Sequence, residues 1–256
     1  MKLATYNIWN SEEGMPARTD AIWKEILKIG ADFICLQEVA DDKTAETITA
    51  KAGFEYLFFD SYENEQEGLC IASKIPFEEK ESWFYDTKAI FVCFHYRNKR
   101  IGIVNLHLPW DSVRERERQI VRIVSRINEK ELHFAFLFGD FNCSETSDIH
   151  RYLKGDCLLA GEEANPRWYD LAESYAEISD TAAESTLNFR ENPRFQDNTI
   201  ETNERFDRIL LRNTYPEEFP VLKQCVVFGK TIYEDINCCA SDHYGVMAEI
   251  ELGGEA

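Results

Sequence analysis

The chain contains 256 residues, of which 44% are hydrophobic and 13% are aromatic. A chain of this size and composition can bury a sizeable core, which excludes a disordered or fibrous protein. Its 28 basic and 47 acidic residues give a formal net charge of −19. A field of that sign repels polyanions, which argues against a protein that coats nucleic acid regardless of sequence.

Apolar periodicity in the first half of the chain predicts alternating strands and helices. A strand at 3–8 is followed by apolar residues at helical spacing, whose helix ends at Gly30. A buried strand at 32–39 and a helix at 43–51 come next. Short apolar runs separated by polar turns then predict strands at 54–59, 68–73, 77–85, 89–96 and 101–108.

The second half continues with an Arg/Glu-rich helix at 112–129 that carries one apolar stripe, and with a strand at 132–138. The pattern weakens over 143–205, where two short helices are predicted near 148–153 and 170–175. The last strands are predicted at 206–211, 222–228 and 244–252.

This element order favours an α/β architecture of mixed sheets with helices on their outer faces, rather than a doubly wound parallel sheet. Because no linker or repeat divides the chain, we expect one domain at 1–252 with a short tail at 253–256.

The eight cysteines are scattered along the chain and form no C-x-x-C pair of the kind that binds zinc. The amino terminus has no signal-peptide core, and no apolar run approaches the ~18 residues of a membrane span. We therefore expect a cytoplasmic protein with reduced cysteines and without a membrane span.

Polar residues that have no obvious reason to be buried recur at the ends of the apolar strands. If the strands lie side by side, these groups converge on one rim. Carboxylates packed together there stay ionised only with a cation between them, and oxygen ligands favour Mg²⁺ or Mn²⁺ over zinc. The residues concerned are Asn7, Gln37, Glu38, Asn105, His107, Asp140, Asn142, Asp207, Asp242 and His243.

Six stretches containing these residues resemble the endonuclease/exonuclease/phosphatase superfamily, in the order that the superfamily has them. The resemblance implies a four-layer α/β/β/α sandwich, in which two packed mixed β-sheets are flanked by helices. It also implies hydrolysis of a phosphodiester or phosphomonoester with Mg²⁺. The stretches are Thr5-Tyr6-Asn7-Ile8, Leu36-Gln37-Glu38-Val39, Asn105-Leu106-His107-Leu108, Gly139-Asp140-Phe141-Asn142, Phe206-Asp207-Arg208-Ile209 and Ser241-Asp242-His243.

The resemblance implies a metal site and assigns three residues to it. Glu38 matches the principal metal-binding residue of the superfamily. Asn7 is expected beside it as a ligand or phosphate contact, and Asp242 as an auxiliary metal or active-site carboxylate.

Five further residues carry catalytic roles by the same resemblance. Asp140 matches the residue that orients or deprotonates the attacking water, and Asn142 and His107 match phosphate contacts. His243 matches a residue that acts either as general base or as a donor to the transition state. Asp207 matches the carboxylate that orients that ring.

The stretch Arg205-Phe206-Asp207-Arg208-Ile209 is more similar to tyrosyl-DNA phosphodiesterase 2 and its bacterial relatives than to the abasic endonucleases, which usually have Asp-Tyr there. Trp9 departs from that group, which often has Asp there. Residues 190–212 contain five arginines and five acids and are neutral, so a small or end-bound phosphodiester fits better than long duplex. Among nucleic acids, DNA ends or adducts are the expected substrates.

Two alternatives remain open. One is a phosphodiesterase or phosphatase that acts on a small molecule or a lipid headgroup. The other, an inactive binding module, is disfavoured because Glu38, Asp140, Asn142 and His243 are all present. We expect a monomer that acts on a phosphate ester.

Three histidines lie outside the motifs. His95 and His133 are expected to be structural residues in or beside strands, and His150 to lie on a helix surface.

Overall fold

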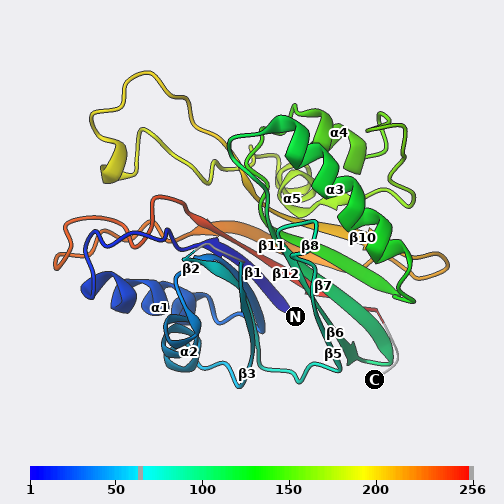
Figure 1. Cartoon of the computed structure of the whole chain (residues 1–256), viewed down its shortest axis with the longest axis horizontal. Helices are drawn as coiled ribbons and strands as arrows, with labels where there is room; N and C mark the ends of the chain where they lie inside the picture. The colour runs from blue at the N-terminus through cyan, green and yellow to red at the C-terminus, as the bar shows by residue number, and fades with distance from the viewer. Residues whose placement is uncertain (63–65, 254–256) are drawn as a thin grey trace.

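In the computed structural model, which describes residues 1–62 and 66–253, two six-stranded sheets face each other (Figure 1). The first sheet has the order β11-β12-β1-β2-β4-β3 and the second has the order β5-β6-β7-β8-β10-β9. Both are mixed, because β1 pairs with β2 and β7 pairs with β8 in parallel, whereas the other pairs are antiparallel.

The strands of the first sheet are β1 (Lys2–Asn7), β2 (Phe33–Val39), β3 (Tyr56–Ser61), β4 (Gly68–Ser73), β11 (Val221–Phe228) and β12 (Gly245–Glu251). Those of the second are β5 (Glu79–Ser82), β6 (Ala89–Tyr96), β7 (Lys99–His107), β8 (Phe134–Asp140), β9 (Tyr169–Asp170) and β10 (Asp207–Asn213). The helices are α1 (Ala17–Ile29), α2 (Asp42–Lys51), α3 (Val113–Asn128), α4 (Asp148–Leu153) and α5 (Leu171–Ser179), with a 3₁₀ turn at Pro193–Phe195.

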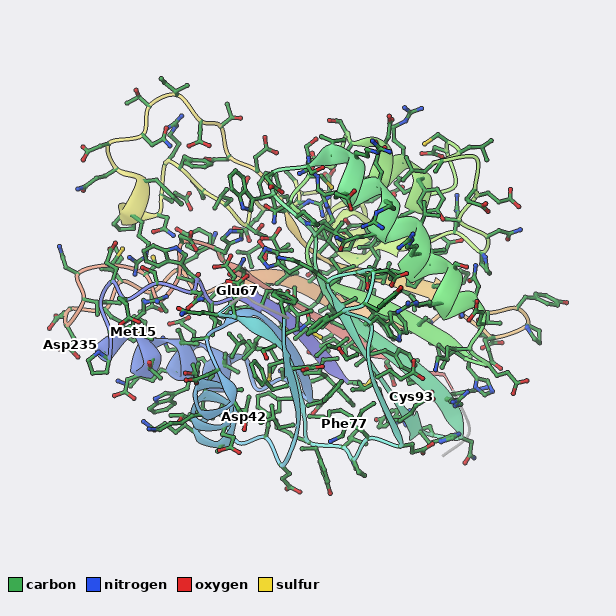
Figure 2. All side chains as sticks on the ribbon, in the orientation of Figure 1. Met15, Asp42, Glu67, Phe77, Cys93 and Asp235 are labelled. Atoms are coloured by element: carbon green, nitrogen blue, oxygen red, sulfur yellow. The ribbon has the colours of Figure 1, made fainter. Side chains whose placement is uncertain are left out.

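Helices cover the outer faces of both sheets. Figure 1 shows α1 and α2 on one side and α3 and α4 on the other. Three apolar clusters fill the spaces: one between the sheets, one under α1 and α2, and one under α3 and α4. Side chains pack throughout these layers (Figure 2). The predicted four-layer sandwich of two mixed sheets flanked by helices is confirmed.

Local sequence explains where the helices begin and end. Gly30 adopts the left-handed conformation (φ 60°) that stops α1, as predicted. The side chain of Ser112 accepts a hydrogen bond from the backbone N–H of Glu115, which caps α3. Asp41 caps α2 in the same way. The predicted boundaries of these helices therefore agree with the structure to within a few residues.

Two of the polar residues at strand ends serve to join the sheets. Gln37 Nε2 donates to Asn105 Oδ1 at 2.6 Å, across the interface between the two sheets. The Asn105 amide also donates to the backbone oxygens of Leu36 and Cys70. Both side chains are fully buried. Their hydrogen bonds fix the end of β2 in the first sheet against the end of β7 in the second.

The prediction that His150 lies on a helix surface is wrong. The ring is 2% exposed, and its Nε2 lies 2.7 Å from Glu173 Oε1. The short helix α4 packs this face against α5, which the helical pattern of α4 could not reveal. His95 is exposed beside Glu78, whereas His133 Nδ1 accepts from the backbone N–H of Arg100.

None of the helices in the described part of the chain is long and apolar enough to cross a membrane. All eight cysteines are free. The predicted tail falls at Gly253 and on residues 254–256, which lie outside the described residues.

Candidate active site

The eight predicted site residues come together at one edge of the two sheets. Asn7, His107 and Asp140 end β1, β7 and β8, and Glu38 is the penultimate residue of β2. Asp207 begins the antiparallel strand β10 opposite Asp140. Asp242 and His243 lie just before β12, and Asn142 follows β8. The parallel pairs explain the convergence, because parallel strands end at the same edge of a sheet.

Asn7 links two of the predicted carboxylates. Its Nδ2 donates to Glu38 Oε1 at 2.9 Å and to Asp140 Oδ2 at 3.1 Å. Its Oδ1 accepts from the backbone N–H of Trp9. In this arrangement the amide nitrogen, rather than the amide oxygen, faces the carboxylates.

The backbone is unusual where it presents these side chains. Glu38 has φ 56° and Asn142 has φ 48°, a region that residues other than glycine seldom occupy. The pairing of β2 with β4 is interrupted between Leu36 and Val39. This irregularity turns Glu38 toward the rim, where its Oε2 accepts from the backbone N–H of Asn10. Such conformations are concentrated at functional sites in proteins.

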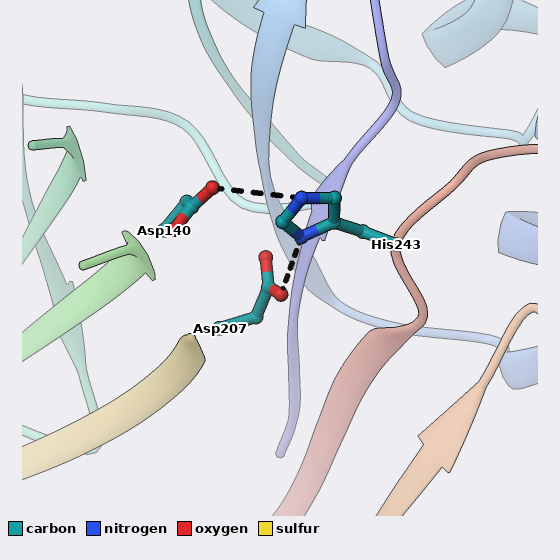
Figure 3. Close-up of side chains that lie close together, drawn as sticks. All are labelled: Asp140, Asp207 and His243. Atoms are coloured by element: carbon teal, nitrogen blue, oxygen red, sulfur yellow. Dashed lines mark hydrogen bonds and ion pairs between the residues drawn. The ribbon is translucent and has the colours of Figure 1, made fainter. Parts of the chain in front are cut away.

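His243 and Asp207 form a buried hydrogen-bonded pair (Figure 3). His243 Nδ1 lies 2.8 Å from Asp207 Oδ2, and His243 Nε2 lies 3.8 Å from Asp140 Oδ2. Thr186 supports the pair, since its Oγ1 accepts from the backbone N–H groups of Phe206 and Asp207. The contact with Asp207 leaves Nε2 as the ring atom that faces the site.

Burial by itself would lower the pKa of His243. The hydrogen bond and charge of Asp207, together with Asp140 and Asp242, outweigh burial and raise the pKa well above its usual value. The shift favours the protonated ring, in which Nε2 carries a proton and faces Asp140.

A second imidazole faces the same carboxylate. His107 Nε2 lies 3.8 Å from Asp140 Oδ2 and 3.9 Å from Glu38 Oε1. Its buried Nδ1 has no hydrogen-bond partner among the described residues and lies 4.0 Å from Glu67 Oε1. Asp140 thus lies between two rings, and its Oδ1 accepts from the backbone N–H of Asn142.

Glu67 belongs to this cluster, although the sequence pattern does not identify it. It immediately precedes β4 and is labelled in Figure 2. Burial, and then the neighbouring Glu38 carboxylate, raise the pKa of Glu67. The same two causes raise the pKa of Asp242. A search that included the residues just before antiparallel strands, as well as those at the ends of parallel strands, would have found Glu67. Both kinds of position lie at this edge of the sheet.

Two residues of the 186–205 segment also position the site without having been predicted. Asn192 is buried and its Nδ2 donates to the backbone oxygens of Ser241 and Asp242. Arg194 lies 4.3 Å from the ring centre of Trp9, which Arg18 approaches to 4.9 Å. These contacts fix the loop before β12 and Trp9, which lies two residues after the end of β1.

The donor set suits a hard divalent cation. Glu38, Glu67, Asp140 and Asp242 supply carboxylate oxygens, and mutual repulsion together with burial raises the pKa of two of them. A cation would relieve that repulsion. Asp140, Asp207 and His243 also place ligand atoms within 4.8 Å of one another, but Asp207 is already engaged by His243.

A second cluster of His150, Asp170 and Glu173 is of a different kind. Arg205 Nη1 lies 2.6 Å from Asp170 Oδ2, and its Nη2 lies 3.1 Å from Glu173 Oε1. Since the guanidinium already provides the positive charge, this cluster is an ion-pair network between α4, β9, α5 and the segment just before β10.

Solved structures with the same fold are similar to the chain over nearly its full length. D. rerio TDP2 complexed with single strand DNA product has a TM-score of 0.75 and 16% identity, covering 97% of each chain. A functionally unknown conserved protein from Enterococcus faecalis has a TM-score of 0.72 and 19% identity, covering 100% of each. An endonuclease/exonuclease/phosphatase from Bacteroides vulgatus has a TM-score of 0.72 and 17% identity, covering 98% of each.

No curated protein sequence matches the chain. A sequence profile of the Endonuclease/Exonuclease/phosphatase family matches residues 4–243. This range contains all eight predicted site residues and every strand of the two sheets except β12 and the first two residues of β1. The chain therefore belongs to the endonuclease/exonuclease/phosphatase family.

Proposed function

We propose that this protein is a phosphoesterase that depends on Mg²⁺ or Mn²⁺ and hydrolyses its substrate by in-line attack of water. The observation that carries the proposal is the contact of one buried carboxylate, Asp140, with both halves of the site. Asp140 accepts from Asn7, which also binds Glu38, and it faces the His243–Asp207 pair. Asp140 therefore connects the proposed metal ligands Asn7 and Glu38 with the proposed proton donor His243.

We assign the metal to Glu38, with Asp242 and Asn7 completing the set. For Asn7 to offer its oxygen, the amide would have to exchange its present contacts with Trp9 and the carboxylates. When bound, the ion supplies positive charge that neutralises the carboxylates and polarises a phosphate oxygen.

The remaining residues act on water and phosphate. Asp140 accepts a hydrogen bond from the attacking water and takes its proton. Asp207 favours the cationic form of His243. The Nε2–H group of that ring donates a hydrogen bond to the phosphate oxygens as negative charge develops on them. The orientation of the ring, with Nδ1 held by Asp207 and Nε2 facing Asp140, supports this role. The raised pKa of His243 agrees with it, because a protonated group is a poor general base. His107 and Asn142 bind phosphate oxygens on either side of Asp140.

The substrate class that we favour is a phosphodiester at a DNA end or adduct. D. rerio TDP2 has a solved structure in complex with single strand DNA product, and this chain shares its fold over nearly the whole length. A small-molecule or lipid-headgroup ester is the second candidate. An inactive binding module remains disfavoured, because the paired His243 and Asp207 and the clustered carboxylates would serve no purpose in it.

We further propose that the protein acts as a monomer with a single domain at 1–252 in the reducing cytoplasm. The three apolar clusters, which together join all four layers, support one domain. The eight free cysteines support the proposal of a reducing compartment.

The test is a hydrolysis panel with Mg²⁺ or Mn²⁺ that contains bis-p-nitrophenyl phosphate, a 5′-tyrosyl oligonucleotide, an abasic duplex, sphingomyelin and an inositol polyphosphate. We expect turnover of at least one ester, and its loss after EDTA treatment and dialysis. Glu38→Gln should raise the metal concentration required for half-maximal rate by at least about tenfold, because it removes the anchoring charge.

Glu46→Gln is the matched control, since Glu46 is exposed on α2 and lies outside the site. Undiminished turnover without metal would overturn the metal assignment. Equal metal dependence in the Glu38 and Glu46 variants would overturn the role of Glu38.

A further inference from the structure

A cavity of about 650 Å³ lies at the end of the second sheet opposite the candidate active site. Arg100 and His133, at the beginnings of β7 and β8, line it, whereas His107 and Asp140 end the same strands. Seven residues of β8 separate the two ends, which is a span of about 20 Å at ~3.3 Å per residue. Its lining residues include Asn128 at the carboxyl end of α3 and Thr214–Glu217 in the β10–β11 connection. Both segments lie on the right in Figure 1.

Arg212, at the inner wall of this cavity, is a buried cation without a counter-ion among the described residues. The residue is 4% exposed, and none of the described carboxylates forms an ion pair with it. Its Nη1 donates to Asn128 Oδ1 at 2.6 Å, whereas its buried Nε has no hydrogen-bond partner in the described chain. Burial lowers the pKa of Arg212 to about 10, which leaves the group charged at neutral pH. A buried charge of this kind is costly unless an anion pairs with it.

The other cations around the cavity already have carboxylate partners. Arg100 pairs with Glu79, and Lys130 pairs with both Glu79 and Glu81. His133 faces Glu217, which Lys99 also contacts. Within the described chain, Arg212 is therefore the one permanent cation of this wall whose charge is left for a ligand.

The rest of the wall combines a polar group with apolar surface. Thr214 Oγ1 is buried without a hydrogen-bond partner among the described residues and lines the cavity beside Arg212. Leu132, Pro166 and Pro216 supply apolar surface. The volume lies within the range of small-molecule sites, which is about 300–1,000 Å³.

We propose that this cavity binds a small organic oxyanion, with one carboxylate or phosphate group and a compact apolar body, and that Arg212 pairs with its charge. Thr214 provides a hydroxyl donor for the same group. The site is separate from the active site in position and in chemistry, because its recognition charge comes from a guanidinium and not from a metal.

The experiment measures binding by ¹⁹F NMR with 4-fluorobenzoate and 4-fluorophenylphosphonate, which carry the two oxyanions on one body. The neutral 4-fluorobenzyl alcohol is the third probe. We expect one or both anions to bind the wild-type chain and the alcohol not to bind. The preferred anion distinguishes a carboxylate ligand from a phosphate ligand.

Two variants remove the free charge in different ways. Arg212→Met deletes it, and Asn128→Asp supplies an internal carboxylate to the nitrogen that now contacts Asn128 Oδ1. Each should weaken anion binding at least about tenfold, the worth of one charge-assisted hydrogen bond. Arg114→Met is the matched control, because it changes the net charge equally at an exposed position of α3.

Asn128→Asp retains the arginine, so it tests the site even if Arg212→Met does not fold. Wild-type affinity in Asn128→Asp would overturn the proposal. Equal loss in Arg114→Met, or no binding of either anion to the wild type at about 10 mM, would also overturn it.

Discussion

The hydrogen bond between His243 and Asp207 determines which ring atom of His243 can act in the site. Asp207 occupies Nδ1, and Nε2 therefore points toward Asp140 (Figure 3). Asp207 is itself held by Thr186, whose hydroxyl oxygen accepts from two backbone N–H groups. The ring is thus oriented by two successive layers of hydrogen bonds, neither of which depends on a ligand.

From this geometry we expect His243→Ala to lower kcat by ~10²–10⁴, the usual worth of a positioned proton donor. Asp207→Asn should give a smaller loss of kcat, because it alters only the orientation and charge of the ring. The measurement is steady-state hydrolysis of the best ester from the panel. His95→Ala, at an exposed position beside Glu78, is the control and should retain the wild-type rate. Wild-type kcat in both site variants, with an inactive Asp140→Asn, would remove His243 from the mechanism.

At the scale of single elements, β8 can pass beside β7 only because residue 139 is a glycine. Gly139 has φ 134°, and a Cβ there would lie 1.8 Å from the backbone oxygen of Leu106. That close approach places Asp140 directly beside His107 in the parallel register. The glycine in this motif therefore serves the geometry of the site as well as the turn that follows.

We expect Gly139→Ala to lower the free energy of unfolding by about 3 kcal/mol or more, because the backbone of β7 or β8 must shift. Urea unfolding monitored by circular dichroism measures the change. Gly53→Ala is the control, since Gly53 also has a positive φ (85°) but has no atom within 4 Å of the added Cβ. That variant should lose only about 1 kcal/mol of backbone strain. Equal losses would show that the contact with Leu106 is unimportant.

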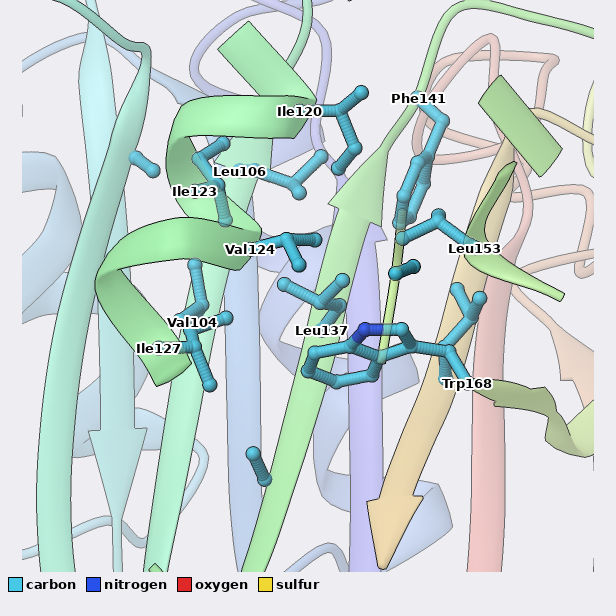
Figure 4. Packing of buried hydrophobic residues seen from close by; sticks show 14 of the residues in the cluster. Val104, Leu106, Ile120, Ile123, Val124, Ile127, Leu137, Phe141, Leu153 and Trp168 are labelled. Carbon is cyan, nitrogen blue, oxygen red and sulfur yellow. The ribbon is translucent and has the colours of Figure 1, made fainter. Parts of the chain in front are cut away.

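The helices of the outer layer are held by two different kinds of contact. The buried stripe of α3, comprising Ile120, Ile123, Val124 and Ile127, packs on β7 and β8 (Figure 4). By contrast, α4 and α5 meet through the network of His150, Glu173 and Arg205. Burial alone would raise the pKa of Glu173, but hydrogen bonds from His150 and Lys154 and the charge of Arg205 hold it at about 2.

This shift makes the stability of the fold depend on pH. Because the folded pKa of about 2 lies below the usual 4.5, Glu173 stabilises the fold above pH 4.5 and loses that contribution as the pH falls toward 2. We expect Glu173→Gln to cost on the order of 1–2 kcal/mol at pH 7, allowing for solvent screening, and less at pH 3. Urea unfolding at both pH values tests this. The control is Glu177→Gln, at an exposed position of the same helix, which should change the free energy of unfolding little at either pH. If Glu173→Gln lost the same free energy of unfolding at both pH values, the prediction would be contradicted.

At the scale of the whole molecule, two features oppose the binding of long nucleic acid. One is the net charge of −19, and the other is that several arginines contact other parts of the chain. Arg205 and Arg208 are buried, and Arg194 pairs with Glu13. Arg190 is exposed but donates to the backbone oxygens of Phe189, Asn198 and Glu201. These four arginines of the 190–212 segment therefore contact other parts of the chain and do not form a basic groove.

For this reason we expect few phosphates to be held if the protein binds DNA. Affinity for single strands should fall with salt at a log–log slope of about −1 to −3, at about −0.7 per neutralised phosphate. Fluorescence anisotropy with Ca²⁺ in place of Mg²⁺ measures binding while suppressing cleavage. We expect no measurable binding to undamaged duplex at physiological salt. A slope steeper than about −5, or submicromolar duplex binding, would instead indicate a general endonuclease.

The order of the elements and the chemical character of the rim could be predicted from the sequence alone. Apolar periods of two and of about 3.6 residues, helix caps such as Ser112 and stops such as Gly30 are local signals. The six motifs have short internal spacing, so the residues that they contain can be named without reference to the fold. Their roles as metal ligands and catalytic groups stay predictions until the variants are measured.

Only the tertiary structure decided which of these groups meet, because that depends on strand order and direction, which no local pattern encodes. It separated Gln37 and Asn105, which join the sheets, from Asn7 and Glu38, which face the rim. It brought in Glu67 through the antiparallel strand β4 and buried His150 against α5. At the far end of β10 it also left Arg212 without a carboxylate partner in the described part of the chain, since pairing there is set by side chains distant in sequence.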